Sequence, residues 1–355
     1  MRKSIEDNEI AGTVTLVATR DKVVQLEASG QANVARAEAM KPDALFWIAS
    51  MTKPLTATAA LMLQDEGKLS IDDPVDKYVP ELHALRSSDG KTATVTIKQL
   101  LTHTSGMALE ASSQERASAK TLAGLMPIYA KLPMRFKPGA KWEYCQAGIN
   151  AAGRVVEVVS GKTLPEFFQE RILDPLGMKD TTFYPTDQQV ARLATGYKRV
   201  DGKLVESPMR SMSGKPLTSH EHYPAANAGL FSTASDYGRF CQMLLNGGSL
   251  DGKKYLKPET ALAMRTIQTG DLVTGFTPGN GWGVGVCVVR QPQGITAMLS
   301  AGSFGHGGAW GTQAWIDPVK GVVYVLMVQR ADFPNSDASP VRKAFQEAAA
   351  EAMSR

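Results

Sequence analysis

Cysteine is scarce in this chain. The three cysteines, Cys145, Cys241 and Cys287, are an odd number, lie far apart and form no C-x-x-C pair. A disulfide framework needs paired cysteines, and a structural zinc site needs closely spaced cysteine or histidine ligands. We therefore expect neither of these, and we expect free thiols that are mostly buried. The segment His220-Glu221-His222 could present both imidazoles on one face of a strand, but no convincing third ligand accompanies them, so we expect no metal.

Long hydrophobic runs are also missing. The apolar stretch at residues 322–328 has strand length and falls far short of the ~20 residues that a membrane helix needs. The N-terminal segment MRKSIEDNEIAG has a basic start but no apolar core, so we expect no secretory signal within the chain. The net charge of +4 is spread along the sequence without a basic run, which does not favour binding to nucleic acid or to a membrane surface. Compartment and oligomeric state stay open.

Apolar residues are present in sufficient number for one large core, since they make up 43% of 355 residues. The segments GTVTLVATR and VVQLEASG, joined by a short polar turn, predict a strand hairpin near the start. Residues 306–316 and the segment VVYVLMVQ predict further strands near the end, and PVRKAFQEAAAEAM predicts a final helix.

Strands at both ends of the chain around a helical middle predict an α+β fold. We expect one antiparallel sheet, formed by the N- and C-terminal strands and flanked by helices, with a mostly helical lobe inserted between them. The prediction is a single domain over residues 1–355, with an α/β lobe at about 1–70 and 225–355 and a helical lobe at about 71–224.

The motif Ser50-x-x-Lys53 opens a long helical pattern that runs to Gly67, a residue suited to the end of a helix. Pro54 fits the first turn of a helix, where its missing N–H does no harm. Ser50 would then lie at the positive end of the helix dipole, with Lys53 on the same face. By itself the motif is weak, because a helix-capping serine followed by a solvated lysine explains it as well.

Five longer stretches add to this motif, in this order: FWIASMTKPLTATAALMLQDEGKLSIDDPVDKYVPEL, VTIKQLLTHTSGM, FKPGAKWEYCQAGINAAGRVVEVVSGKTLPEFFQERILDPLGMKDTTF, NAGLFSTASDYGRF and GHGGAWGTQAWIDP. With them, nearly the whole chain resembles the class C β-lactamase and penicillin-binding-protein-like serine hydrolases. It is closest to their carboxylesterase branch, the family VIII esterases. The resemblance implies a β-lactamase/transpeptidase-like fold.

The resemblance also implies a catalytic group made of Ser50 as nucleophile with Lys53 and Tyr144 as a general base and acid pair. A serine hydroxyl is a poor nucleophile until a base takes its proton, and lysine or tyrosine can do so only where the surroundings favour the deprotonated form. We expect Lys53 and Tyr144 to share the proton of Ser50 and Tyr144 to pass it to the leaving group. The backbone N–H groups of Ser50 and Ala309 would hold the oxyanion.

Substrate binding is implied for Gln146, His306, Gly307 and Gly308. His306-Gly307-Gly308 occupies the place of the K-T-G motif and lacks its lysine, while Gln146 stands where the family usually has Asn or Ser. The glycines would let a substrate approach the strand edge closely.

Residues beside these motifs allow two interpretations. Aromatic residues next to them either line an apolar acyl pocket or pack in the core, and they are Trp47, Trp142, Phe304 and Trp310. Cys145 next to Tyr144 lacks a cysteine-protease signature, and we expect His103 in LTHTSGM to be structural.

The function that these features favour is a carboxylic ester hydrolase without metal or cofactor, acting on a small-molecule ester or amide through an acyl-enzyme on Ser50. One alternative is a β-lactamase or D-amino-acid peptidase with the same mechanism. The loss of the K-T-G lysine ranks it lower, because that cation could pair with a substrate carboxylate. His306 could still do so when protonated. A further alternative is a non-enzymatic sensor that is acylated without turnover.

Overall fold

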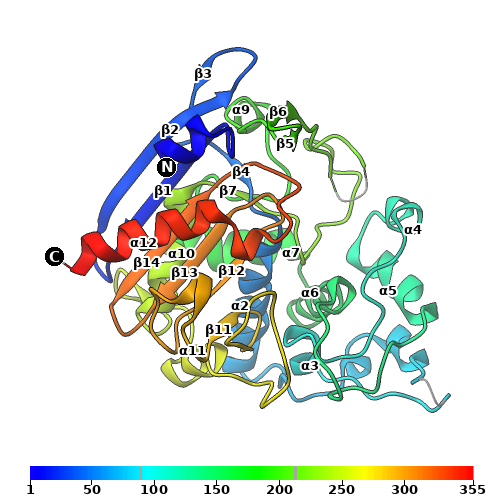
Figure 1. Ribbon diagram of the computed structural model, residues 1–355. Coiled ribbons are helices and arrows are strands. Elements are labelled where there is room, and N and C mark those ends of the chain that lie inside the picture. Colours follow the sequence, from blue (N-terminus) through cyan, green and yellow to red (C-terminus); the bar gives the residue numbers. More distant parts are fainter. Residues whose placement is uncertain (88–89, 212–213, 355) are drawn as a thin grey trace.

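The computed structural model describes residues 1–87, 90–211 and 214–354 (Figure 1). Its largest element is an eight-stranded antiparallel sheet in the order β10-β11-β12-β13-β14-β1-β2-β3. The strands are β1 (Gly12–Ala18), β2 (Val23–Asn33), β3 (Glu38–Ala39), β10 (Asn280–Trp282), β11 (Cys287–Val289), β12 (Phe304–Gly307), β13 (Gln313–Asp317) and β14 (Val322–Met327). Because β1 pairs with β14, the first and last parts of the chain close one sheet, and the predicted α+β architecture is confirmed.

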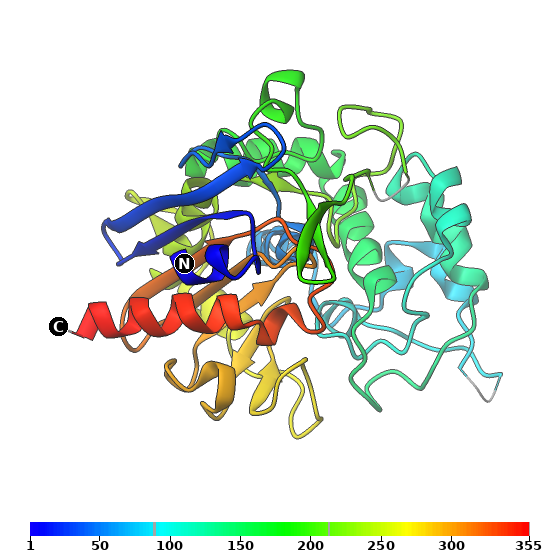
Figure 2. The ribbon, with the colours of Figure 1, turned by 45° about the horizontal axis from the view of Figure 1, so that its top comes forward.

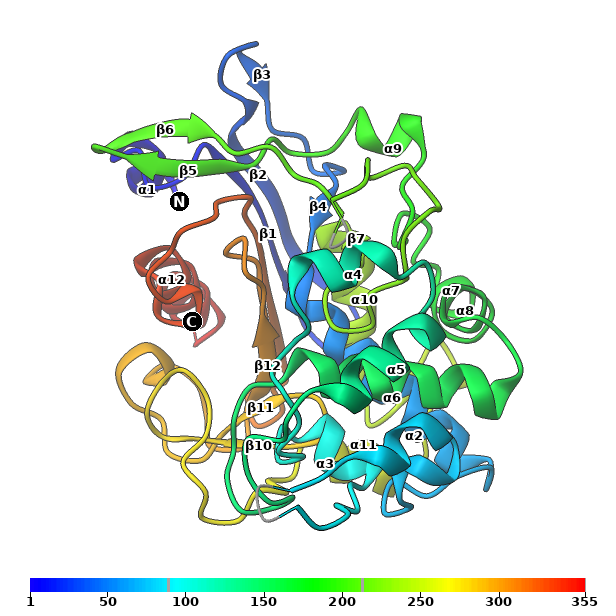
Figure 3. The same cartoon turned by 90° about the vertical axis from the view of Figure 1, so that its right-hand side faces the viewer.

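Helices cover both faces of this sheet. Helix α12 (Pro340–Ser354) lies on one face, and α2 (Thr52–Asp65) and α10 (Ala234–Leu245) lie on the other (Figure 3). Successive side chains of a strand point to opposite faces, so Tyr324 packs with Phe345 of α12 while Val323 and Val325 join the core on the α2 side. This explains why the sequence of β14 is apolar throughout: both of its faces are buried.

Among the remaining elements α6 is the longest, with 15 residues. The helices are α1 (Arg2–Glu6), α3 (Ile97–Leu101), α4 (Ser113–Ser118), α5 (Leu122–Lys131), α6 (Gln146–Ser160), α7 (Leu164–Phe168), α8 (Asp174–Leu176), α9 (Asp187–Val190) and α11 (Pro258–Met264). The strand pairs are β4 (Phe46–Trp47) with β7 (Phe231–Ser232), β5 (Tyr197–Val200) with β6 (Lys203–Glu206), and β8 (Ser249–Leu250) with β9 (Lys253–Lys254). None of the described helices combines the length and the apolar character that crossing a bilayer requires.

Helices α3 to α6 lie together beside the sheet (Figures 1 and 2). One hydrophobic cluster runs through both parts of the molecule and includes Leu55 of α2, Leu125 of α5, Val155 of α6 and Val323 of β14. The division into two lobes at about residues 70 and 225 stays a proposal. Within the range 71–224, the β5–β6 hairpin lies against the sheet side, because the N–H of Tyr197 donates to the carbonyl of Gln329 at 2.9 Å.

Helix α2 is the central element, and eleven of its residues besides Lys53 are buried together with it, from Thr52 to Leu63. The turn between β10 and β11 packs directly against it. Gly285 in this turn has φ of +74°, and a Cβ there would lie 2.4 Å from Cβ of Ala57. The cysteines Cys145, Cys241 and Cys287 are free and buried, as predicted.

We predict that Gly285→Ala lowers the free energy of unfolding more than Gly67→Ala does. Gly67, just after α2, has a similar φ of +71° but no atom within 4 Å of a built Cβ, so its variant bears only the left-handed backbone cost of about 1 kcal/mol. Gly285→Ala bears that cost and the overlap with Ala57, which adds about 1–3 kcal/mol. Urea denaturation of both variants measures the difference. Equal losses of unfolding free energy in the two variants would show that α2 can move away from the added Cβ at little cost.

Candidate active site

The chain reaches Ser50 through a sharp turn. Strand β4 ends at Trp47, and a 3₁₀-helical turn at Ala49–Met51 leads into α2. Ala49 adopts φ of +45°, a conformation that costs a residue with a Cβ about 1 kcal/mol. Hydrogen bonds hold the turn, since Oγ1 of Thr52 donates to the carbonyl of Ala49 at 2.7 Å and the Tyr237 hydroxyl donates to that of Met51 at 2.8 Å. Ser50 thereby lies in the turn just before the N-terminus of α2.

Lys53 is fully buried one turn further along. Its Nζ lies 3.1 Å from Oγ of Ser50 and donates to the main-chain carbonyl of Asn227 at 2.9 Å. Burial lowers the pKa of Lys53 well below its usual value, and the negative charge of Glu110 opposes this shift only in part. A neutral amine keeps one lone pair and can accept a proton from a hydroxyl at this distance.

Tyr144 contacts both Lys53 and Ser50. Its ring centroid lies 4.6 Å from Nζ of Lys53, and its hydroxyl shares a hydrogen bond with Ser50. The same hydroxyl lies 3.4 Å from Nε2 of His306. Burial raises the pKa of Tyr144 above its usual value, so the phenol keeps its proton. Lys53 is thus a neutral amine that can accept a proton, and Tyr144 is a phenol that can donate one.

His103 holds Tyr144 in place through its two chain neighbours. The N–H of Glu143 donates to the carbonyl of His103 at 3.0 Å, and the N–H of Cys145 donates to its Nδ1 at 3.1 Å. The rings of His103 and Tyr144 lie 4.5 Å apart. His103 is fully buried at φ of +60°, and burial lowers its pKa well below the usual value. A neutral imidazole is what the acceptor role of Nδ1 requires.

His306 lies on β12 opposite Tyr144. Its Nδ1 donates to the carbonyl of Gly307 at 2.6 Å, which leaves Nε2 as an acceptor toward the Tyr144 hydroxyl. Burial, with the charge of Lys53 as a smaller cause, lowers the pKa of His306 to about 3. The imidazole is therefore uncharged at neutral pH, and the sequence alternative of a protonated His306 that binds a carboxylate is not favoured.

The two glycines after His306 are required by protein neighbours rather than by a substrate. A Cβ on Gly307 would lie 2.0 Å from Oδ1 of Asp337, and a Cβ on Gly308 would lie 2.5 Å from the carbonyl of Ile48. Both contacts are shorter than any ordinary Cβ contact. The glycines still line the cleft described below, so the expected location is right and the expected reason changes.

Gln146 contacts neither Ser50 nor Lys53 through a described hydrogen bond. Its Oε1 accepts from Nδ2 of Asn227 at 2.9 Å. Asn227 is itself fully buried, and its N–H donates to Oδ1 of Asn150 at 3.3 Å. The longer side chain of Gln146 thus contacts Asn227, the residue whose main-chain carbonyl accepts a hydrogen bond from Lys53. Sequence reasoning missed Asn227, although it begins the quoted stretch NAGLFSTASDYGRF.

One cleft of about 430 Å³ brings the predicted residues together. Ser50, Tyr144, Gln146, His306, Gly307, Gly308 and Ala309 all line it, and Lys53 lies buried beneath Ser50. The cleft is completed by Phe276 and by a segment from Phe333 to Asp337. Sequence reasoning missed these residues because they lie on loops that carry no motif.

The aromatic residues singled out from the sequence do not line this cleft. Phe304 packs in the core at 2% exposure, the ring of Trp142 packs against that of Tyr144, and the rings of Trp47 and Trp310 pack against each other at a tilt, 5.9 Å apart. Of the two interpretations, packing holds for Phe304, and none of the four rings forms an acyl pocket in the cleft at Ser50.

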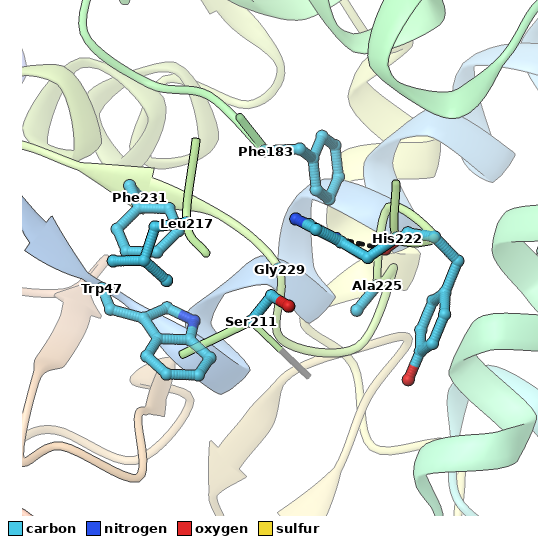
Figure 4. A pocket seen from close by; sticks show the side chains of 9 residues that line it. Trp47, Phe183, Ser211, Leu217, His222, Ala225, Gly229 and Phe231 are labelled. Carbon is cyan, nitrogen blue, oxygen red and sulfur yellow. Dashed lines mark hydrogen bonds between the residues drawn. The ribbon is translucent and has the colours of Figure 1, made fainter. Parts of the chain in front are cut away.

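A second, mostly apolar cavity lies next to Trp47 (Figure 4). Its lining residues include Trp47, Phe183, Leu217, His222 and Phe231. His222 donates through Nδ1 to the carbonyl of Tyr223, 3.1 Å away, and His220 stacks on Tyr184. Among the described residues no group of three or more His, Cys, Asp or Glu side chains could hold a metal ion.

Comparison with known proteins assigns the family. The family model described as Beta-lactamase matches residues 1–349. The chain is a member of the beta-lactamase family. This family member is 33% identical to Protein Rv1367c of Mycobacterium tuberculosis, over 96% of this chain and 90% of that protein. It is 30% identical to Esterase EstB of Burkholderia gladioli, over 93% of this chain and 88% of the esterase.

Solved structures show the same fold. The structure of EstCE1, described as a hydrolase with promiscuous acyltransferase activity, superposes with a TM-score of 0.86 and 26% identity, covering 99% of this chain and 96% of that one. The resemblance inferred from the sequence is confirmed, and the beta-lactamase family member stands among serine hydrolases that include esterases.

The buried amine predicts a pH-dependent stability. The pKa of Lys53 is lower in the folded than in the unfolded chain, so the unfolded chain binds more protons, and the contribution of Lys53 to stability rises with pH up to its usual pKa. We expect Lys53→Met to unfold at higher urea concentration than the wild type near neutral pH, by on the order of 1 kcal/mol. The difference in unfolding free energy between Lys53→Met and the wild type should become smaller as the pH approaches about 10. A difference that does not depend on pH would contradict a lowered pKa of Lys53.

Proposed function

We propose that this beta-lactamase family member is a carboxylic ester hydrolase that works through an acyl-enzyme on Ser50. The observation that carries the proposal is the buried Nζ of Lys53, 3.1 Å from Oγ of Ser50, with a pKa lowered by burial. A base within hydrogen-bond distance and neutral at working pH is what a serine nucleophile needs. The relationship to Esterase EstB supports the ester bond as the target.

The proposed reaction has two halves. In acylation, Lys53 takes the proton of Ser50 as Oγ forms a bond to the ester carbonyl carbon, and Tyr144 gives its proton to the alcohol oxygen as the carbon–oxygen bond to the alcohol breaks. The proton on Lys53 then replaces the one that Tyr144 lost. In deacylation a water attacks the acyl carbon and gives a proton to the same pair, and Ser50 leaves with a proton.

The oxyanion of each tetrahedral intermediate would accept from the backbone N–H groups of Ser50 and Ala309. Ser50 and Ala309 both line the cleft, which supports this assignment. Fixed donors of this kind are a large contribution to acyl transfer.

The charges of the cleft favour an uncharged ester over a β-lactam or a D-peptide. Among the described residues that line the cleft none is lysine or arginine, and His306 is neutral because its pKa falls to about 3. The carboxylate of Asp337 also lies in the cleft wall. A substrate carboxylate would meet no fixed cation and one fixed anion there.

The sensor alternative has less support. A protein that is acylated without turnover needs no acid for the leaving group and no base for the water. Lys53 and Tyr144 are both in contact with Ser50. Tyr144 is held in this position because the residues before and after it donate hydrogen bonds to His103.

We predict that Ser50→Ala loses at least about a thousandfold in kcat/KM on nitrophenyl butyrate, because the nucleophile of the acyl-enzyme is gone. Intact-mass detection of a butyryl adduct on the wild type and its absence in the variant provide the matching structural readout. Full activity in Ser50→Ala would refute the mechanism. A chromogenic cephalosporin is the companion substrate, and turnover at rates comparable to the ester would place the chain with the β-lactamases.

The pH dependence of kcat/KM tests the base. We expect the rate to fall toward acid as Lys53 becomes protonated, and to fall at a pH below the usual pKa of lysine because burial lowers the pKa of Lys53. Lys53→Met and Lys53→Arg should both lose about a hundredfold or more. Arginine keeps a positive charge and cannot act as a base, so an active Lys53→Arg enzyme would show that Lys53 serves as a cation instead.

A further inference from the structure

Asp337 is the one acidic side chain among the described residues that line the cleft at Ser50, and no lysine or arginine accompanies it there. It lies in the 3₁₀-helical turn at Ser336–Ala338, just before α12. In the described part of the chain, no ion pair involves its carboxylate. A carboxylate that forms no ion pair in a cleft wall gives the cleft a local negative field.

The position of this carboxylate is fixed by the protein. Its Oδ1 accepts from Nε2 of Gln313 at 3.0 Å, and the N–H of Asp337 donates to Oδ1 of Asn335 at 3.0 Å. The absence of a side chain on Gly307 leaves room for Oδ1 beside β12. The carboxylate therefore requires little reorganisation to meet a ligand.

The buried cation Arg342 is close enough for the charge of Asp337 to oppose in part the lowering of the Arg342 pKa by burial, but its hydrogen bonds go to other groups. Its Nη1 donates to the main-chain carbonyl of Asp337 at 2.6 Å, and its Nε donates to Oε1 of Gln346 at 2.9 Å. Its guanidinium lies 4.1 Å from the ring centroid of Trp315. Arg342 thus supports the turn from the buried side, while the carboxylate of Asp337 borders the cleft.

Aromatic rings line the cleft together with this carboxylate. Phe276 and Phe333 line it with Tyr144, and the Phe276 ring meets the Tyr144 ring edge-on at 5.0 Å. The guanidinium of Arg330 lies 4.2 Å from the ring centroid of Phe333, so Phe276 is the ring left for a ligand. Nδ2 of Asn335 donates to the carbonyl of Phe276 at 2.8 Å, which joins the two loops. Aromatic rings near a carboxylate form an environment that favours an alkylammonium ion over a neutral group of the same shape.

Tyr144 indicates which half of an ester would lie here. Tyr144 and Asp337 line the same cleft, and Asp337 lies beside Gly307, the residue after His306, whose Nε2 is 3.4 Å from the Tyr144 hydroxyl. Under the proposed mechanism that hydroxyl gives its proton to the departing alcohol. The alcohol half of the ester would therefore lie between Tyr144 and Asp337.

We propose that this cleft selects esters whose alcohol carries a positive charge, and that Asp337 with Phe276 recognises that charge. The inference rests on the proposed ester hydrolase and adds its substrate class. Asp337 acts here as a specificity-determining residue.

The test compares two esters of equal shape, butyrylcholine and neohexyl butyrate, in which a carbon atom replaces the quaternary nitrogen. For the wild type at low ionic strength we expect kcat/KM to be about tenfold higher for the cationic ester. Asp337→Asn keeps an acceptor for Gln313 and removes the charge, so the ratio of the two kcat/KM values should fall close to one. Asp271→Asn makes the same change of net charge at a fully exposed carboxylate that does not line the cleft, and it should leave the ratio as in the wild type.

The outcomes separate the inference from the function on which it rests. A wild-type ratio near one, or a ratio that Asp337→Asn leaves unchanged, overturns the cationic substrate class while Ser50-dependent hydrolysis of the neutral ester upholds the hydrolase. Ser50-dependent hydrolysis of nitrophenyl butyrate with no activity on either test ester also overturns the cationic class. Absence of Ser50-dependent activity on all of these esters overturns the proposed function itself.

Discussion

The amine of Lys53 is buried between the hydroxyl of Ser50 and the main-chain carbonyl of Asn227, and the chemistry proposed for this protein depends on that burial. An ammonium ion loses most of its hydration inside a protein, so burial favours the neutral amine. The same burial keeps the proton on Tyr144. In the proposed mechanism, one physical cause therefore makes a base and an acid of two groups whose usual pKa values are nearly equal.

The fold keeps the amine of Lys53 buried. Helix α2 carries Lys53 in the middle of the molecule, between the sheet and the helices that follow it in the sequence. Gly285 brings the β10–β11 turn into contact with Ala57 on α2, and His103 holds the chain on both sides of Tyr144. These contacts stabilise a site that is costly in itself, since a buried amine and the left-handed Ala49 both oppose folding.

The loops around the cleft supply a different property. The segment from Phe333 to Asp337 and the loop with Phe276 provide aromatic surface and one negative charge, while His306 remains neutral. Under the proposed function, the scaffold accounts for acyl transfer in general, and the loops account for which acyl donor fits. The family relationship extends over both, but sites on a shared fold differ mainly in such loops.

The sequence by itself determined the features that depend on local pattern. Alternating and continuous apolar runs predicted the strands at both ends, and the motifs around Ser50, Tyr144 and His306 identified the residues that the structure brings into one cleft. Only the tertiary structure decided the rest. The carbonyl of Asn227 beneath Lys53, the aromatic packing of Phe304 and Trp47, the neutral state of His306 and the place of Asp337 all depend on contacts between distant segments. Desolvation and charge are properties of the surrounding volume, and no local stretch of sequence specifies that volume.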